Sequence, residues 1–124
     1  MKRNMDLVYK ILEFTENKSD FTSPELPMIE GFDQTIICYH IKILSQARLL
    51  EAKDWSSDDG PEWVLTHMTN YGHDFFENLK QKTIWETIKS EFKDASLDTI
   101  ISVSKQLAEG WAKKKVNALL AENS

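Results

Sequence analysis

The chain has 124 residues, of which 41% are hydrophobic and 28% are charged. This ordinary globular composition excludes a largely disordered protein. No apolar run approaches the roughly 20 residues that span a bilayer, so we expect no membrane segment. The formal net charge of −5 disfavours a protein that holds nucleic acid mainly by phosphate contacts, unless a local basic patch exists.

The single cysteine, Cys38, excludes an internal disulfide and fits a reducing, cytoplasmic setting. No basic cluster lies beside it, so we interpret it as a small helix residue rather than a reactive thiol. The first residues predict an amphipathic helix rather than a signal peptide, because Asp6, Lys10 and Glu13 interrupt the apolar run. Asn4 can cap this helix, which we expect to end in the polar residues 16–20.

The next segment, residues 21–32, contains Pro24 and Pro27, which lack the amide donor of a helix. We predict an irregular stretch with a short edge strand around residues 26–30. Asp33 can then cap a helix over residues 34–48. His40 falls on its inward side and is expected to be a hydrogen-bonded core histidine rather than a metal ligand. The outward and boundary positions are polar: Gln34, Thr35, Tyr39, Lys42, Ser45 and Gln46.

A ribbon follows, with strand-like segments LLEAKDW and EWVLTHMT on either side of a polar turn at residues 56–61. Trp55 and Trp63 flank the turn, and we expect them to cover each other across the ribbon. The turn also carries Asp58 and Asp59, which a phosphate backbone would repel. A protein partner or solvent therefore suits this tip better than DNA.

Three more helices are expected. Thr69 can cap the first, Thr83 and Glu86 form a capping box for the second, and Ser96 opens a last helix that runs to about residue 121. An apolar stripe of this length is long for a small monomer, so we expect part of it to pack against a second copy. The three lysines at residues 113–115 either face solvent or contact phosphates.

The order helix, strand, polar tip, strand, helix over residues 31–77 is typical of a winged helix. We predict a mainly α fold with a small antiparallel β-ribbon (α+β). A winged-helix-like domain covers residues 1–80, and a helical extension covers residues 81–124. The helix over residues 34–48 would be the recognition helix, whose polar side chains either suit base edges or form a solvated face. The helix that normally supports it is expected to be absent or short.

Signals for catalysis are weak. The pair His73-Asp74 is found in metal phosphohydrolases, but no further ligands lie at a suitable spacing. The chain has no phosphate-binding glycine loop, Cys/His cluster or Gly-x-Ser-x-Gly motif. We expect a non-enzymatic protein without cofactor or metal, in which His73 and Asp74 tie the strand–helix junction to the ribbon by hydrogen bonds.

Three blocks carry a family resemblance: MKRNMDLVYKILE, ICYHIKILSQARLLEA and LTHMTNYGHDFFENLKQKTIWETIK. In this order they resemble the bacterial and phage family known as domain of unknown function 2513. The sequence departs from the family pattern at Arg48, where glycine is usual, and at Asn70-Tyr71, where Trp-Glu is frequent. The resemblance implies a winged-helix-like fold and a mobile-element context, and it supplies no activity.

Two functions remain. The first is a DNA-binding transcriptional regulator of phage or prophage type, dimeric through the last helix, that reads DNA with the polar residues of helix 34–48. The second is an acidic, phage-encoded inhibitor that binds a basic protein partner, such as a host nuclease or defence complex. The fold pattern favours the first, whereas the net charge, the acidic tip and the missing support helix favour the second.

Overall fold

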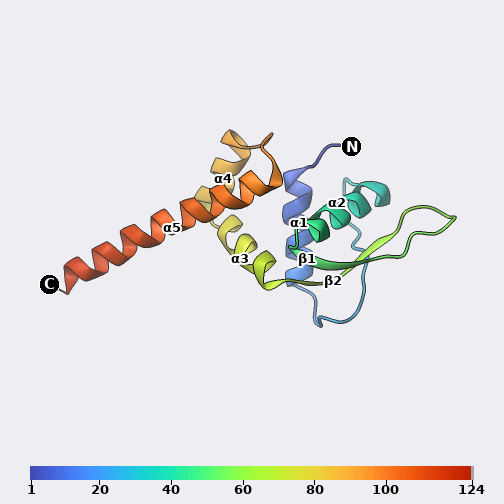
Figure 1. Cartoon of the computed structure of the whole chain (residues 1–124), viewed down its shortest axis with the longest axis horizontal. Helices are drawn as coiled ribbons and strands as arrows, with labels where there is room; N and C mark the ends of the chain where they lie inside the picture. Colours follow the sequence, from blue (N-terminus) through green and yellow to red (C-terminus); the bar gives the residue numbers. More distant parts are fainter. Residues whose placement is uncertain (124) are drawn as a thin grey trace. The chain divides into compact units, whose positions relative to one another are not determined.

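The computed structural model describes residues 1–123, which are mainly helical with one two-stranded antiparallel sheet (Figure 1). This confirms the predicted fold class. The chain divides into two compact units, Met1–Phe76 and Glu77–Ser124. In chain order the elements are α1 (Met5–Glu16), α2 (Gln34–Gln46), β1 (Leu50–Asp54), β2 (Trp63–Met68), α3 (Asn70–Leu79), α4 (Lys82–Glu91) and α5 (Leu97–Glu122).

The core of the first unit lies between α1, α2 and the ribbon. Apolar residues at helical spacing place Leu7 and Ile11 of α1 at 0% exposure. Ile41 and Leu44 of α2 and Leu65 of β2 are equally buried. Each such side chain contributes about 1.5–3 kcal/mol relative to exposure to water. Burial of one face thus fixes which side of α2 remains outside.

Both α1 and α2 begin at the caps expected from the sequence. The Oδ1 atom of Asn4 accepts a hydrogen bond from the amide of Leu7 at 3.1 Å, and the Oδ1 atom of Asp33 accepts one from the amide of Ile36 at 2.9 Å. Each cap satisfies an amide that has no partner within its helix. The cap at Asp33 therefore fixes where α2 begins, and with it which residues lie on each of its faces.

β1 and β2 pair with Asp54 opposite Trp63, and a bulge interrupts the register after Glu51. A third segment joins β2 at a single residue, where the amides and carbonyls of Glu25 and Leu65 exchange hydrogen bonds of 2.8 and 2.9 Å. The edge strand expected around residues 26–30 is therefore reduced to one bridge just before it. Pro27 cannot donate to a ladder, which accounts for the interruption.

The turn from α2 into β1 is held by residues of the strand–helix junction. Arg48 adopts a left-handed conformation with φ of 65°. Its carbonyl accepts a 2.6 Å hydrogen bond from the hydroxyl of Thr69, and that hydroxyl accepts the amide of Gly72 at 2.9 Å. A side chain on Gly72 would overlap the carbonyl of Leu49. Thr69 thus caps α3 as predicted, and Gly72 allows the close approach.

In the second unit α4 packs on α5, with Ile84 and Ile88 buried on α4. The predicted capping box at Thr83 is wrong, because α4 begins one residue earlier at Lys82 with Gln81 at the N-cap. A tight turn, in which the amide of Gln81 bonds the carbonyl of Asn78, starts the helix before Thr83 is reached. The cap predicted at Ser96 is confirmed, since its hydroxyl accepts the amide of Thr99 at 3.1 Å.

Candidate nucleic-acid interface

The six polar residues predicted to bind DNA lie together on the outward side of α2, hereafter the α2 polar face. Four of them are exposed and two, Tyr39 and Ser45, are half-buried. The opposite side of the helix is buried in the core. The structure therefore brings the predicted residues onto one surface. The set is Gln34, Thr35, Tyr39, Lys42, Ser45 and Gln46.

A basic segment that sequence reasoning missed lies beside this face. Residues 1–4, hereafter the N-terminal arm, are joined to α2 through a 2.8 Å hydrogen bond from the amide of Asn4 to Nε2 of His40. Met1 lines the same hollow as Thr35, Tyr39 and other residues of α2. Met1 therefore lies next to the α2 polar face, and Lys2 and Arg3 lie in the chain between Met1 and the hydrogen bond of Asn4 to His40. The sequence signal for this arm was the Lys2-Arg3 pair immediately before Asn4, the cap of α1.

His40 is the residue that connects the arm to the helix. Its ring is fully buried, its Nδ1 atom lies 2.8 Å from the carbonyl of Ile36, and its Nε2 atom accepts the amide of Asn4. This arrangement requires a neutral ring with the proton on Nδ1. Burial lowers the pKa of His40, with Arg3 adding to the effect. The expectation of a hydrogen-bonded core histidine is confirmed.

A hollow of about 340 Å³ separates the α2 polar face from the ribbon. At the edge of this hollow, the Nζ atom of Lys42 lies 6.0 Å from the ring centroid of Trp63, which is a cation–π contact. Hydrogen bonds from Ser56, with Lys42 nearby, hold the pKa of Asp54 below its usual range. Lys42 thus lies over the ribbon, and the carboxylate of Asp54 offsets part of its positive charge.

Cys38 is buried beneath this hollow. Its sulfur accepts the amide of Trp63 at 3.3 Å, and burial raises the pKa of the thiol. A raised thiol pKa keeps the sulfur protonated and unreactive at neutral pH. The interpretation of Cys38 as a structural helix residue is confirmed.

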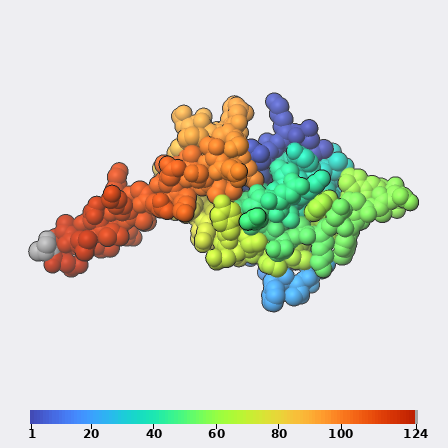
Figure 2. Space-filling model, viewed as in Figure 1, coloured from blue at the N-terminus to red at the C-terminus, as the bar shows by residue number. Residues whose placement is uncertain are grey.

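The ribbon tip at residues 56–61 projects from the first unit, in light green in Figure 2. Asp58 and Asp59 are exposed there, and no basic residue lies between positions 54 and 62. The expected covering of Trp63 by Trp55 is wrong. Asp54 is the partner of Trp63, so the adjacent Trp55 faces the other side of the ribbon, where it is 49% exposed.

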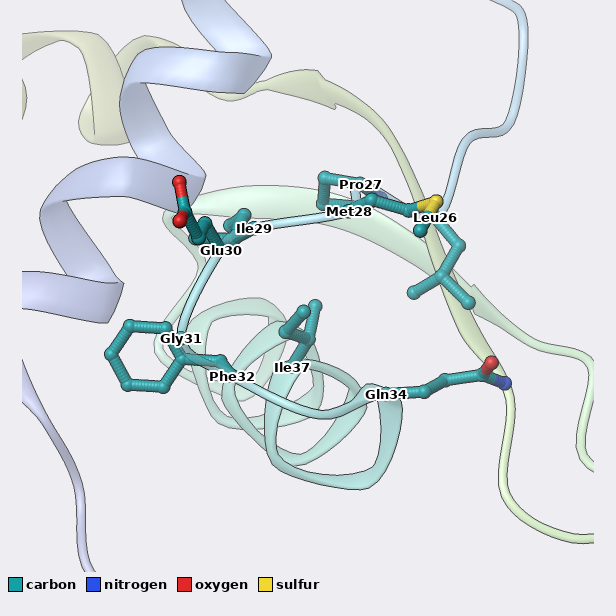
Figure 3. A pocket seen from close by; sticks show the side chains of 9 residues that line it. All are labelled: Leu26, Pro27, Met28, Ile29, Glu30, Gly31, Phe32, Gln34 and Ile37. Atoms are coloured by element: carbon teal, nitrogen blue, oxygen red, sulfur yellow. The ribbon is translucent and has the colours of Figure 1, made fainter.

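A second hollow, of about 650 Å³, lies between α2 and the loop of residues 26–32. Figure 3 shows this loop crossing over α2, with Ile37 pointing from the helix toward it. Leu26 and Ile29 are half-buried, whereas Met28 is 97% exposed. The described residues between α1 and α2 contain no helix. The expected absence of a supporting helix is thus confirmed, and a loop stands in its place.

The residues considered for metal chemistry are dispersed. His73 and Asp74 are exposed on α3. Among the described residues 1–123, neither side chain forms a hydrogen bond. Their predicted hydrogen-bonded role at the junction is wrong, because Thr69 and Gly72 hold it instead. Within residues 1–123, no group of three or more His, Cys, Asp or Glu side chains is arranged to hold a metal ion.

Residues 2–98 match the family described as "Hypothetical protein (DUF2513)". The chain belongs to this family. An uncharacterised protein of Haemophilus influenzae is 36% identical over 110 residues, which are 88% of this chain and 93% of that protein. No solved structure matches the chain. The DUF2513 match includes the N-terminal arm from Lys2, α2 and the ribbon, and it ends within the first turn of α5.

One further property concerns membranes. In the part of the chain that the structure describes, no helix is both long enough and apolar enough to cross a bilayer.

Proposed function

We propose that the protein is a non-enzymatic, winged-helix-like DNA-binding regulator of phage or prophage type, in which α2 enters the major groove. The observation that carries this proposal is the N-terminal arm, in which the basic residues Lys2 and Arg3 lie between Met1, in the hollow beside the α2 polar face, and Asn4, which is hydrogen-bonded to His40. Polar side chains on a helix read base edges, and a flanking basic arm contacts phosphates or the minor groove.

The order of elements supports the proposal. A helix, a strand-like bridge at Glu25, the helix α2 and a two-stranded ribbon follow one another as in winged-helix domains. The difference is the loop of residues 26–32, which replaces the helix that usually crosses the DNA backbone. Contacts from that side are therefore reduced, and the N-terminal arm supplies the basic residues Lys2 and Arg3 instead.

The charge distribution predicts a modest, salt-sensitive affinity. Lys2, Arg3 and Lys42 are the basic residues at this surface, whereas Asp33 and Asp54 offset them. Each neutralised phosphate contributes about −0.9 to the slope of log K against log salt. Three contacts therefore give a slope of roughly −3. This is well below the slope of strongly basic regulators, in keeping with an acidic protein.

The test is a titration of the purified protein against genomic DNA fragments at several salt concentrations. Lys42→Ala is expected to weaken binding and to reduce the salt slope by about 1. Lys93→Ala removes the same charge from an exposed position in the second unit and is expected to leave binding unchanged. The proposal fails if no fragment binds even at low salt, or if both substitutions have the same effect.

The acidic ribbon tip favours a second candidate, a module that binds a basic protein such as a nuclease or defence complex. Asp58 and Asp59 project from the tip, and the exposed Trp55 nearby is a residue type enriched in protein interfaces. An acidic surface can occupy the basic channel in which such a target holds nucleic acid.

Neutralising the tip separates the two candidates. Asp58→Asn with Asp59→Asn is expected to leave DNA affinity unchanged or slightly higher if α2 binds DNA, because a repulsive charge is lost. The same change is expected to abolish retention of a basic protein from host lysate if the tip is the binding surface. Glu86→Gln with Asp94→Asn is the matched control, since it removes two exposed carboxylates from the second unit.

A further inference from the structure

The helix α5 differs between its two halves. Leu97, Ile100, Ile101 and Ser104 are buried, whereas every described residue from position 105 onward is half-buried or exposed. In Figure 2 the second half, toward the red end of the colour bar, is a single helix on the face in view. Large apolar side chains lie on this half, with exposed fractions of 38% for Leu107, 57% for Trp111, 52% for Val116, 49% for Leu119 and 64% for Leu120.

The buried side of the first half continues along the second. Successive residues of an α-helix are rotated by about 100°, so eight positions from 104 to 122 fall on one side of α5. We call this side the α5 seam. Most of its members are apolar or small, and uncovered apolar surface of this extent marks an interaction site. The seam consists of Ser104, Leu107, Ala108, Trp111, Lys115, Ala118, Leu119 and Glu122.

We propose that the α5 seam pairs with the seam of a second copy of this chain, antiparallel and about a twofold axis near residue 113. Reversing the helix about this point superimposes the seam on itself. Leu107 then lies level with Leu119 of the second copy along the helix pair, and Ala108 lies level with Ala118. The same patch serves both copies, which is the condition for a closed twofold dimer.

The charges on the seam favour a second copy in the antiparallel direction. Lys115 Nζ lies 5.1 Å from the centroid of Trp111 within one helix, and the antiparallel register also brings each Lys115 to the Trp111 of the other copy. A parallel pair would instead place Lys115 against Lys115, which is repulsive. Lys113 projects from the opposite side of α5 and stays in solvent.

The length of the seam sets the expected strength of association. Residues 104–122 span about 28 Å at 1.5 Å per residue. A single helix pair of this length buries less than the roughly 800 Å² per partner of a standard interface. The dimer is therefore expected to dissociate on dilution, with a dissociation constant on the order of micromolar.

The test is sedimentation of the whole protein over a roughly thousand-fold range of concentration. Leu107→Lys and Leu119→Glu alone are each expected to weaken association at least about tenfold, because each buries an unpaired charge. Together in one chain they are expected to restore it to within about threefold, because the antiparallel register sets each lysine level with a glutamate across the seam, within reach of its long side chain. Both positions are exposed in the single chain, so folding is retained.

The control introduces the same charges on the opposite side of α5. Gln106→Lys and Asn117→Glu, both at exposed positions, are expected to leave association unchanged. A monomer at every concentration would overturn the proposal, as would equal weakening by the control pair. Failure of the double substitution at Leu107 and Leu119 to recover would overturn the antiparallel register.

Discussion

Two regions of the first unit have opposite character. At the strand–helix junction between β2 and α3, a Cβ atom on Gly72 would overlap the backbone of Leu49. The hydroxyl of Thr69 accepts the amide of the same glycine. On the α2 polar face, side chains such as Gln34 and Gln46 are exposed. The conspicuous motif glycine therefore stabilises the fold, whereas the candidate binding residues are inconspicuous in sequence.

Gly72→Ala is expected to have the largest effect. The added Cβ would overlap the carbonyl of Leu49 and contact Met68, and backbone atoms can move aside only by separating β1 from α3. We expect the free energy of unfolding to fall by about 3 kcal/mol, at the upper end for overpacking. Urea denaturation measures this loss. A change below about 1 kcal/mol would show that the junction is looser than described.

His40→Gln is expected to remove both a stabilising contact and a pH dependence. Burial lowers the pKa of His40 in the folded state, so the unfolded chain binds the proton first as the pH falls. The stabilisation is complete above the unfolded pKa of about 6.5 and is lost as the pH decreases toward the folded pKa. We expect a loss of about 2 kcal/mol at neutral pH.

The pH profile of thermal unfolding provides the check on His40. The wild-type protein is expected to lose stability between pH 6.5 and 5 more steeply than His40→Gln, which cannot take up a proton there. Parallel profiles for the two proteins would contradict the buried neutral ring.

Arg48→Gly is expected to stabilise the protein slightly. Arg48 has φ of 65° at the end of α2, a conformation that glycine adopts without steric cost. Greater flexibility of the unfolded chain offsets part of this gain. We expect an increase of about 0.5–1 kcal/mol in the free energy of unfolding, measured in urea. A decrease would mean that the Arg48 side chain makes a contact that outweighs its strain.

His73→Ala is expected to change stability by less than about 0.5 kcal/mol, because the side chain is exposed. Together with the result for Gly72→Ala, this would show that two neighbouring motif residues contribute differently to stability. A loss as large as that of Gly72→Ala would contradict the exposed position of His73. Differential scanning calorimetry of the two variants provides the comparison.

The sequence predicted features that depend on local chemistry. Asn4, Asp33 and Ser96 cap their helices because a side-chain acceptor satisfies an adjacent amide. The missing helix before α2 followed from Pro24 and Pro27 in the same way. These features require only a few neighbouring residues, which a sequence displays directly.

Features that depend on distant contacts escaped prediction. The N-terminal arm lies beside α2 because of a hydrogen bond between residues 36 positions apart. The register that turns Trp55 away from Trp63 depends on the pairing of two strands. One local signal also failed, because a neighbouring turn began α4 before the capping box at Thr83 was reached. A candidate site assembled from such distant contacts can be read from sequence only in part.

The most direct test of DNA binding by α2 and the N-terminal arm is an amide chemical-shift titration of the protein with a DNA duplex at low salt. We predict that the largest shifts fall on Lys2, Arg3, Thr35 and Lys42, with the amides of Asp58 and Gly60 at the ribbon tip unaffected. Shifts confined to the tip, or no shifts at all, would contradict the account and direct attention to a basic protein partner.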